Sequence, residues 1–257
     1  MKQVRRFLLR ILPARAIRLA HFFNHPESYT LLSDFRYHQD GLATQHNCDF
    51  MDEERFGRAY RLGESTGSWE GGQVHWRAHV ACWAAARARH LDGDFVECGV
   101  NKGGLALTVA QYVDFQNLPK KFYLLDTFCG IPEKYISSEE KELGRSPGAY
   151  EECYEQVKTV FQPFDNVVIV RGVVPETLNQ IKSDRISYLS LDMNCAEPEI
   201  AAAEFLWDKL VSGAVMLLDD YGWAGHLAQK RAFDQFARER DVPILSLPTG
   251  QGVIIKS

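Results

Sequence analysis

The chain has 257 residues, of which 46% are hydrophobic and 25% are charged, and its formal net charge is −5 at pH 7. These values are those of an ordinary soluble globular protein, with room for one decorated α/β domain or for two small domains. The mild negative charge gives no general argument for nucleic-acid binding, and we expect no nucleic-acid partner.

The cysteines give no sign of a zinc ribbon or a redox pair, because no two of them form a CxxC motif. Two lie within apolar segments, where a reduced, buried thiol is the expected state. We therefore expect a cytoplasmic protein. The six cysteines are Cys48, Cys82, Cys98, Cys129, Cys153 and Cys195.

The N-terminal segment, residues 1–23, is basic and partly apolar. Arg10 and Pro13 interrupt its apolar run, which argues against a signal peptide, and the run is too short for a membrane span. Two interpretations stay open: a surface or dimer-packing helix, and an amphipathic segment lying peripherally on an anionic membrane. We expect residues 1–72 to form a partly helical N-terminal extension. We also expect the protein to be a homo-oligomer, most simply a dimer.

From residue 73 onward, helical and extended patterns alternate, which predicts a largely parallel sheet with helices on both faces. The last two strands are separated only by Thr249, Gly250 and Gln251, so they must form an antiparallel hairpin. The fold class is thus α/β: a Rossmann-like, seven-stranded sheet of the class I methyltransferase type, over residues 73–257. Helices are expected at 73–90, 104–113, 149–161, 175–181, 198–210 and 226–240, and strands at 94–100, 121–126, 166–172, 186–192, 213–220, 243–248 and 252–257.

Ligands of such sheets bind beyond the carboxyl ends of the strands. The first strand ends in ECGVNKGG, residues 97–104, where the spacing from Gly99 to Gly103 is not the GxGxxG of dinucleotide sites. This pattern suits S-adenosylmethionine, which has no phosphate, and Glu97 is placed to face its positively charged amino end. A plain strand-to-helix turn is the alternative.

The second strand ends in Asp126, followed by Thr127 and Phe128. An acidic residue at this point is where the two hydroxyls of a ribose are commonly held. The alternative is a solvated helix cap.

The fourth and fifth strands end in acidic residues: Asp192, followed shortly by Asn194, and the adjacent pair Asp219 and Asp220. Neighbouring strands would bring these carboxylates to one edge of the sheet. Hard oxygen ligands of this kind suit Mg²⁺, which also relieves the repulsion between adjacent carboxylates. The alternative is that one aspartate caps the next helix and the other is solvated.

Four stretches in order, ECGVNKGG, LLDTFCGIPE, LSLDMN and LLDDYGWAGH, resemble the macrocin O-methyltransferase (TylF/MycF/NovP-like) family over about residues 60–257. The resemblance implies an S-adenosylmethionine- and divalent-metal-dependent enzyme acting on sugar hydroxyls of natural products. It implies metal ligands at Asp192, Asp219 and Asp220, with Asp192 as general base. Expected cofactor contacts are Glu97, Gly99, Val100, Gly103, Asp126, Thr127, Phe128, Gly172 and Asp192.

Two loops depart from the family pattern, so the acceptor is not carried over. They are MNCAEPE at 193–199 and GVVPETL at 172–178. His226 is a second candidate for the catalytic base, or else a surface residue at the start of a helix. His75 and His79, one helical turn apart, are expected to pack rather than to bind metal.

The long polar segment 133–148 is either a lid over the acceptor or a surface loop. Other functions remain as alternatives: methylation of a catechol-like hydroxyl, a nicotinamide-dependent oxidoreductase, or a non-catalytic scaffold that binds S-adenosylmethionine. The missing GxGxxG argues against the oxidoreductase, and the clustered carboxylates argue against the scaffold.

Overall fold

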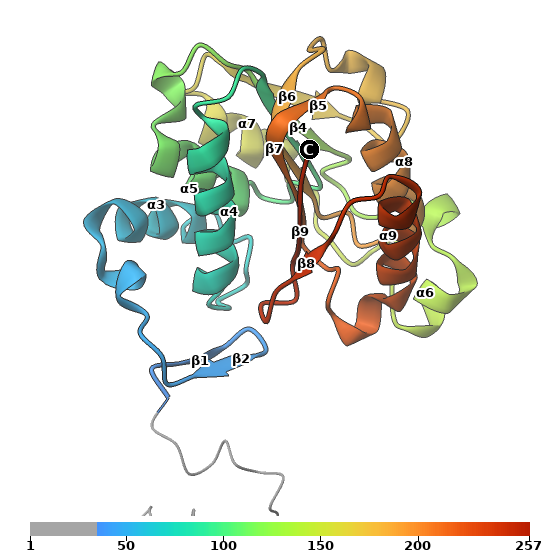
Figure 1. Ribbon diagram of the computed structural model, residues 1–257, viewed down its shortest axis with the longest axis horizontal. Coiled ribbons are helices and arrows are strands. Elements are labelled where there is room, and N and C mark those ends of the chain that lie inside the picture. The colour runs from blue at the N-terminus through green and yellow to red at the C-terminus, as the bar shows by residue number, and fades with distance from the viewer. Residues whose placement is uncertain (1–34) are drawn as a thin grey trace, which may run out of the picture. The chain divides into compact units, whose positions relative to one another are not determined.

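The computed structural model describes residues 35–257, and the basic segment 1–23 lies outside the described residues. The chain divides into two compact units, residues 1–49 and residues 50–257. In the first unit, strands β1 (Tyr37–Gln39) and β2 (Leu42–Thr44) pair as an antiparallel hairpin (Figure 1). No helix among residues 35–257 has the length and apolar character needed to span a membrane.

The second unit is built on a seven-stranded sheet in the order β5-β4-β3-β6-β7-β9-β8. The five parallel strands are β3 (Asp94–Cys98), β4 (Phe122–Asp126), β5 (Val167–Arg171), β6 (Ile186–Leu191) and β7 (Leu210–Leu218). Strands β8 (Leu245–Ser246) and β9 (Gly252–Ile255) form the antiparallel end of the sheet. The predicted α/β class and terminal hairpin are therefore confirmed.

Helices cover both faces of this sheet, as the alternating pattern predicts. One apolar cluster joins α4 (His75–Ala88), α5 (Gly104–Val113) and α7 (Tyr154–Phe161) to one face. A second cluster joins α8 (Ala196–Trp207) and α9 (Leu227–Glu239) to the other face. Successive strand residues alternate between the clusters: Phe95 belongs to the first and Val96 to the second.

Helix α3 (Glu54–Glu64) packs on α5 and belongs to the compact unit that starts at residue 50. The extension suggested by the sequence ended at residue 72, so it includes this helix. The predicted boundary at residue 72, between an accessory extension and the methyltransferase domain, stays a prediction.

Two expected elements differ in type in the structure. The helix expected at 175–181 is only a 3₁₀ turn, Leu178–Gln180, since so short a segment gains few helical hydrogen bonds. The polar segment 133–148 contains helix α6 (Ser138–Glu142), which begins with a capping box between Ser137 and Glu140. Glu140 also accepts a hydrogen bond from the backbone N–H of Ala196 at 2.8 Å, which attaches the segment to the start of α8.

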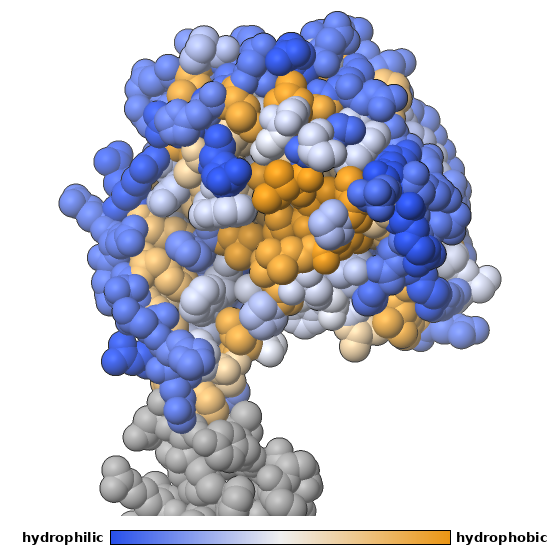
Figure 2. Space-filling model, in the orientation of Figure 1, coloured by the Kyte–Doolittle hydropathy of each residue, from blue (hydrophilic) through white to orange (hydrophobic). Residues whose placement is uncertain are grey.

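Hydrophobic residues gather at the centre of one face of the molecule, over the region of the terminal hairpin (Figure 2). Leu245 on β8 and Ile255 on β9 are exposed large hydrophobic residues. All six cysteines are free thiols, and Cys82 and Cys98 are buried.

Candidate active site

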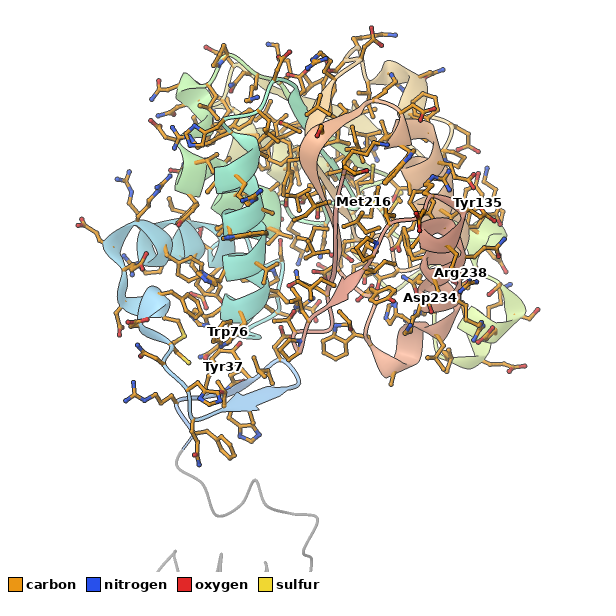
Figure 3. All side chains as sticks on the ribbon, viewed as in Figure 1. Tyr37, Trp76, Tyr135, Met216, Asp234 and Arg238 are labelled. Carbon is orange, nitrogen blue, oxygen red and sulfur yellow. The ribbon has the colours of Figure 1, made fainter. Side chains whose placement is uncertain are left out.

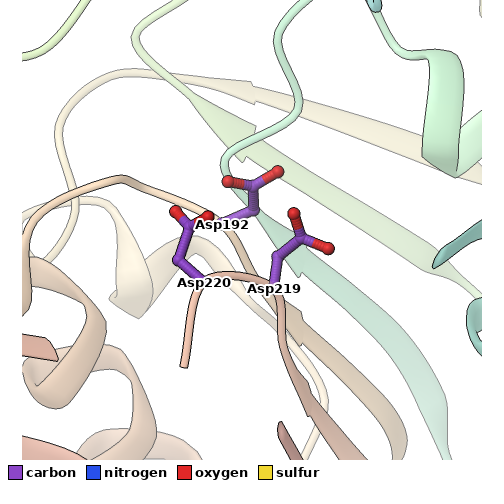
Figure 4. A group of neighbouring side chains, drawn as sticks. All are labelled: Asp192, Asp219 and Asp220. Atoms are coloured by element: carbon purple, nitrogen blue, oxygen red, sulfur yellow. The ribbon is translucent and has the colours of Figure 1, made fainter. Parts of the chain in front are cut away.

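The three predicted aspartates converge at the carboxyl ends of β6 and β7. Leu191 of β6 pairs with Leu218 of β7, so the next residues, Asp192 and Asp219, lie side by side. One oxygen atom from each of Asp192, Asp219 and Asp220 lies within 4.8 Å of the others. Figure 4 shows the three side chains extending toward one another from the strand ends. The grouping inferred from the order of the strands is therefore present in the fold.

Asp219 is held by two donors that the sequence did not identify. Nη1 of Arg77, on α4, donates to its Oδ2 at 2.6 Å, and Nε2 of Gln251 donates to its Oδ1 at 3.0 Å. The Asp219 side chain is 3% exposed, so both hydrogen bonds are shielded from water. Nothing in the local sequence marks Arg77 or Gln251, because both are brought in from other elements.

Asp220 lies beside the imidazole of His226. His226 Nδ1 is 3.1 Å from Asp220 Oδ2 and 2.8 Å from Gln229 Oε1. The imidazole contact to Asp220 Oδ2 does not have hydrogen-bond geometry, so this oxygen is buried without a hydrogen-bond partner among residues 35–257. A buried carboxylate oxygen in this state is costly unless a further group binds it.

Like charges and burial act together on this cluster. Burial and repulsion by Asp219 and Asp220 raise the pKa of Asp192 well above its usual range. Burial and repulsion by Asp219 and Glu199 do the same to the pKa of Asp220. A bound cation would stabilise the ionised forms and oppose both shifts.

Glu199 and Gln229 form a buried network behind His226. Glu199 Oε1 accepts hydrogen bonds from the backbone N–H groups of Met193 at 2.8 Å and Asn194 at 3.1 Å, and from Gln229 Nε2 at 3.2 Å. Because the Gln229 amide directs its NH₂ group toward this acceptor, its Oε1 faces His226. The network therefore favours the imidazole tautomer with hydrogen on Nδ1 and leaves Nε2 as the unprotonated nitrogen.

We expect nitrogen-15 NMR to find His226 neutral at pH 7, with its hydrogen on Nδ1, in protein stripped of divalent cations. Burial, followed by the positive charge of Arg145, lowers the pKa of His226 to about 4, so the ring is uncharged above that pH. The signal is assigned by its loss in His226→Gln. A protonated imidazolium at pH 7, or hydrogen on Nε2, would contradict the arrangement.

The turn after β3 approaches the cluster through backbone packing. Gly99 has φ +88°, and a Cβ there would overlap the carbonyl oxygen of Asp192. The backbone N–H of Asp192 donates to the carbonyl of Cys98 at 2.9 Å. The glycine is thus required by contact with the β6 loop, whereas the sequence suggested only a tight turn and close approach to a ligand.

Glu97 lies at the end of β3 and is 1% exposed. Its Oε2 is buried without a hydrogen-bond partner among the described residues. Burial, then repulsion by Asp219 and Asp126, raises its pKa well above the usual value. A cationic group at this atom would satisfy it, which fits the positively charged amino end of S-adenosylmethionine.

Asp126 braces the turn after β3. Its Oδ2 accepts from the backbone N–H groups of Val100 at 2.6 Å and Asn101 at 2.8 Å, and its Oδ1 accepts from that of Phe128 at 2.7 Å. Thr127 Oγ1 donates to the carbonyl of Gly130 at 2.6 Å. The ribose-binding role of Asp126 stays a prediction, to which the structure adds a role in holding the loop.

The remaining expected cofactor contacts include two further glycines with positive φ. Gly103 has φ +86° at the start of α5, where a Cβ would meet the Phe161 ring, and Gly172 has φ +148° beside Thr177. Val100 and Phe128 are buried at 4% and 1% exposure. Packing within the chain accounts for these residue types, and their contact with a cofactor stays a prediction.

The side chains of His75, His79 and Tyr221 lie in surroundings different from those of the carboxylates. His75 stacks on Tyr60 with ring centroids 3.9 Å apart, and His79 stacks on Phe50 at 4.0 Å. The packing role expected for this pair therefore agrees with the structure. Tyr221 donates to Asp234 Oδ1 at 2.6 Å and lines a surface hollow together with Asp234 and Arg238. Both Asp234 and Arg238 belong to α9 (Figure 3).

The donor chemistry of these residues fits the groups that the sequence led us to expect. Three converging carboxylates, one with an unpartnered buried oxygen, suit a hard divalent cation such as Mg²⁺. The buried Glu97 carboxyl beside the β3 turn suits a cationic ligand group. The order of the strands reverses at β3, the position where open α/β sheets bind their ligands.

The sheet order and terminal hairpin define a class I methyltransferase fold. The sequence model of the macrocin O-methyltransferase (TylF) family matches residues 66–246. The chain belongs to this family.

Three known proteins illustrate the relationship. The 8-demethyl-8-(2,3-dimethoxy-alpha-L-rhamnosyl)-tetracenomycin-C 4'-O-methyltransferase of Streptomyces olivaceus is 26% identical over 149 residues, covering 54% of this chain and 57% of that protein. The O-methyltransferase NovP is similar in structure with a TM-score of 0.60 and 21% identity, over 70% of this chain and 79% of NovP. An O-methyltransferase from Bacillus cereus in complex with SAH has a TM-score of 0.56 and 12% identity, over 80% of this chain and 95% of that one. At these identities the two solved structures support the fold alone.

Proposed function

We propose that this protein is an S-adenosylmethionine-dependent O-methyltransferase that uses a divalent cation and acts on a sugar hydroxyl of a natural product or glycoconjugate. The observation that carries the proposal is the convergence of Asp192, Asp219 and Asp220 beside the β3 turn and Glu97. Family membership supports methyl transfer, and the rhamnosyl group in the name of the Streptomyces relative supports a sugar acceptor. This chain matches little more than half of that relative's length, so the sugar acceptor is part of the proposal.

In this mechanism, Asp192, Asp219 and Asp220 would hold Mg²⁺, and Glu97, Gly99 and Asp126 would help to hold the cofactor. The metal, when bound, would make an acceptor hydroxyl more acidic and fix its position. S-adenosylmethionine, when bound, would supply the methyl group, which would pass to the acceptor oxygen as the carbon–sulfur bond breaks and leaves its electron pair on sulfur. The hydroxyl proton passes to Asp192 or His226.

The surroundings of the two candidate bases differ. Asp192 is half-buried, and its Oδ1 is 3.3 Å from the donor Nδ2 of Asn194. His226 has its Nδ1 engaged with Gln229, so only Nε2 is available to accept a proton. The Glu199–Gln229 network therefore leaves the free lone pair on Nε2 of His226. This supports His226 as a candidate base beside Asp192.

A methyl-transfer screen tests the proposal with and without Mg²⁺, over glycosides, catechol-like aromatics and glycolipids. We expect turnover with a sugar-containing acceptor, and loss of turnover in EDTA that added Mg²⁺ restores. Turnover of catechols alone would assign the other acceptor class. Calorimetry with S-adenosylhomocysteine and with NADH adds a binding test, and binding of NADH alone would refute the methyltransferase assignment.

Four further expectations remain predictions. Light scattering tests the expected homo-oligomer, for which the exposed Leu245 and Ile255 offer apolar surface. Vesicle sedimentation of the full chain tests peripheral membrane contact through residues 1–23. A cytoplasmic location and closure of segment 133–148 as a lid are likewise untested.

A further inference from the structure

Arg77 brings a fixed positive charge into the carboxylate cluster from a distant part of the chain. It lies on α4, and its Nη1 donates to Asp219 Oδ2 at 2.6 Å. Its side chain is 22% exposed and that of Asp219 3%, so solvent screens this ion pair less than it would a surface pair. The guanidinium also approaches the Trp223 ring, with Cζ 5.8 Å from the ring centroid.

The charges suggest why an arginine belongs here. Asp192, Asp219 and Asp220, when ionised, carry three negative charges, and an arginine remains protonated in proteins. The three ionised aspartates and Arg77 together therefore carry two net negative charges, which one divalent cation neutralises. Among residues 35–257, two basic side chains lie within salt-bridge distance of the three aspartates: Arg77 and His226. Because His226 is neutral, Arg77 supplies the positive charge when no divalent cation is bound.

Asp219 does not depend on Arg77 alone for its orientation. Gln251 Nε2 donates to the other carboxylate oxygen, Oδ1, at 3.0 Å, and this residue is 0% exposed. Removing the guanidinium would thus leave a neutral donor that keeps the side chain in place. The main effect of the removal on a metal is then electrostatic, because a repelling positive charge is lost.

We propose that Arg77 is the resident counter-cation of this cluster, which pairs with Asp219 when no divalent cation is bound and weakens the affinity for that cation. This inference rests on the metal-binding part of the proposed function. It makes Arg77 a positioning residue that sets how tightly the site holds its metal.

The test is titration of Mg²⁺ alone into the full-length protein by calorimetry, with no cofactor or acceptor. For Arg77→Gln we expect the Kd for Mg²⁺ to fall about tenfold, since a unit charge a few ångströms away is worth at least that much in a partly buried site. The metal-free variant should melt at a lower temperature than the wild type, because the carboxylates lose their counter-charge.

Arg87→Gln is the matched control. Arg87 lies on the same helix, is exposed, and stacks over Trp83 with Cζ 5.3 Å from the ring centroid. Ten positions along a helix correspond to about 15 Å, beyond the screening length of physiological salt. We expect its Kd for Mg²⁺ to stay within about twofold of the wild type.

An unchanged or higher Kd in Arg77→Gln would overturn the inference, a higher value meaning that Arg77 orients Asp219 for the metal. If the metal-free variant does not fold, circular dichroism should show that Mg²⁺ restores its fold, because a bound cation replaces the lost charge. A variant that stays unfolded at saturating Mg²⁺ would also overturn it. A wild type that binds no Mg²⁺ refutes instead the metal-binding part of the proposed function.

Discussion

Asp219→Asn is expected to lower kcat at least about a hundredfold, while the affinity for S-adenosylhomocysteine stays nearly unchanged. The substitution removes the central charge of the carboxylate trio and so weakens the cation that positions the acceptor. A loss of positioning of this kind costs roughly a factor of 10² or more. One of the two hydrogen bonds to this side chain is kept, because an asparagine still offers an oxygen atom to Arg77, whereas the Gln251 amide loses its acceptor.

Steady-state kinetics with the acceptor found by the screen, and calorimetry with S-adenosylhomocysteine, separate the two effects. Asp184→Asn is the control, because the Asp184 side chain is fully exposed at 100% and precedes β6, at the opposite end of that strand from the site. Wild-type kcat in Asp219→Asn, or full activity of the wild type in EDTA, would remove the metal from the mechanism. A large loss of cofactor affinity would instead move Asp219 into the cofactor site.

Gly99→Ala is expected to destabilise the fold by about 3 kcal/mol or more. Part of the cost is the positive φ of +88°, which a residue with a Cβ adopts at about 1–2 kcal/mol. The rest is overlap with the Asp192 carbonyl, which forces the backbone of two loops apart at a further cost of roughly 1–3 kcal/mol. Because Asp192 moves with its backbone, Mg²⁺ affinity should fall as well.

Gly67→Ala separates these two contributions. Gly67 has φ +76°, but a Cβ there would meet no atom within 4 Å, so only the conformational cost applies. Urea unfolding of the two variants should differ by the cost of the overlap. Equal losses of stability in both would mean that the β3 and β6 loops are not packed as tightly as the structure has them.

The regular elements could be predicted because their signals are local. Strand β4 and helix α5 lie where the apolar pattern indicated, since burial on both faces demands continuous apolar residues and helical packing demands a repeat near 3.6. The helix expected at 175–181 failed because its pattern is too short to show whether a full helical turn is stabilised. Within segment 133–148, the capping box of Ser137 and Glu140 was a readable signal for α6 that the polar composition obscured.

The site was predictable only in part. Asp192, Asp219 and Asp220 could be grouped because they come just after the ends of two strands, and adjacent parallel strands end at one edge. No comparable rule predicts the partners of these aspartates, because Arg77 lies on a helix 142 positions before Asp219. Glu199 and Gln229 read as ordinary helix residues, and their role depends on how α8 and α9 pack together.

By itself, the sequence determined the α/β class, the family and the acidic edge of the sheet. Hydrophobic periodicity and the residues at strand ends are local signals, which can be read without knowing the distant contacts. The tertiary structure alone decided which charges surround that edge. It set Arg77 and Gln251 against Asp219, and directed Gln229 toward His226. The physical reason is that electrostatic and hydrogen-bond energies depend on separations of a few ångströms, which the packing of remote elements creates and which no local pattern records.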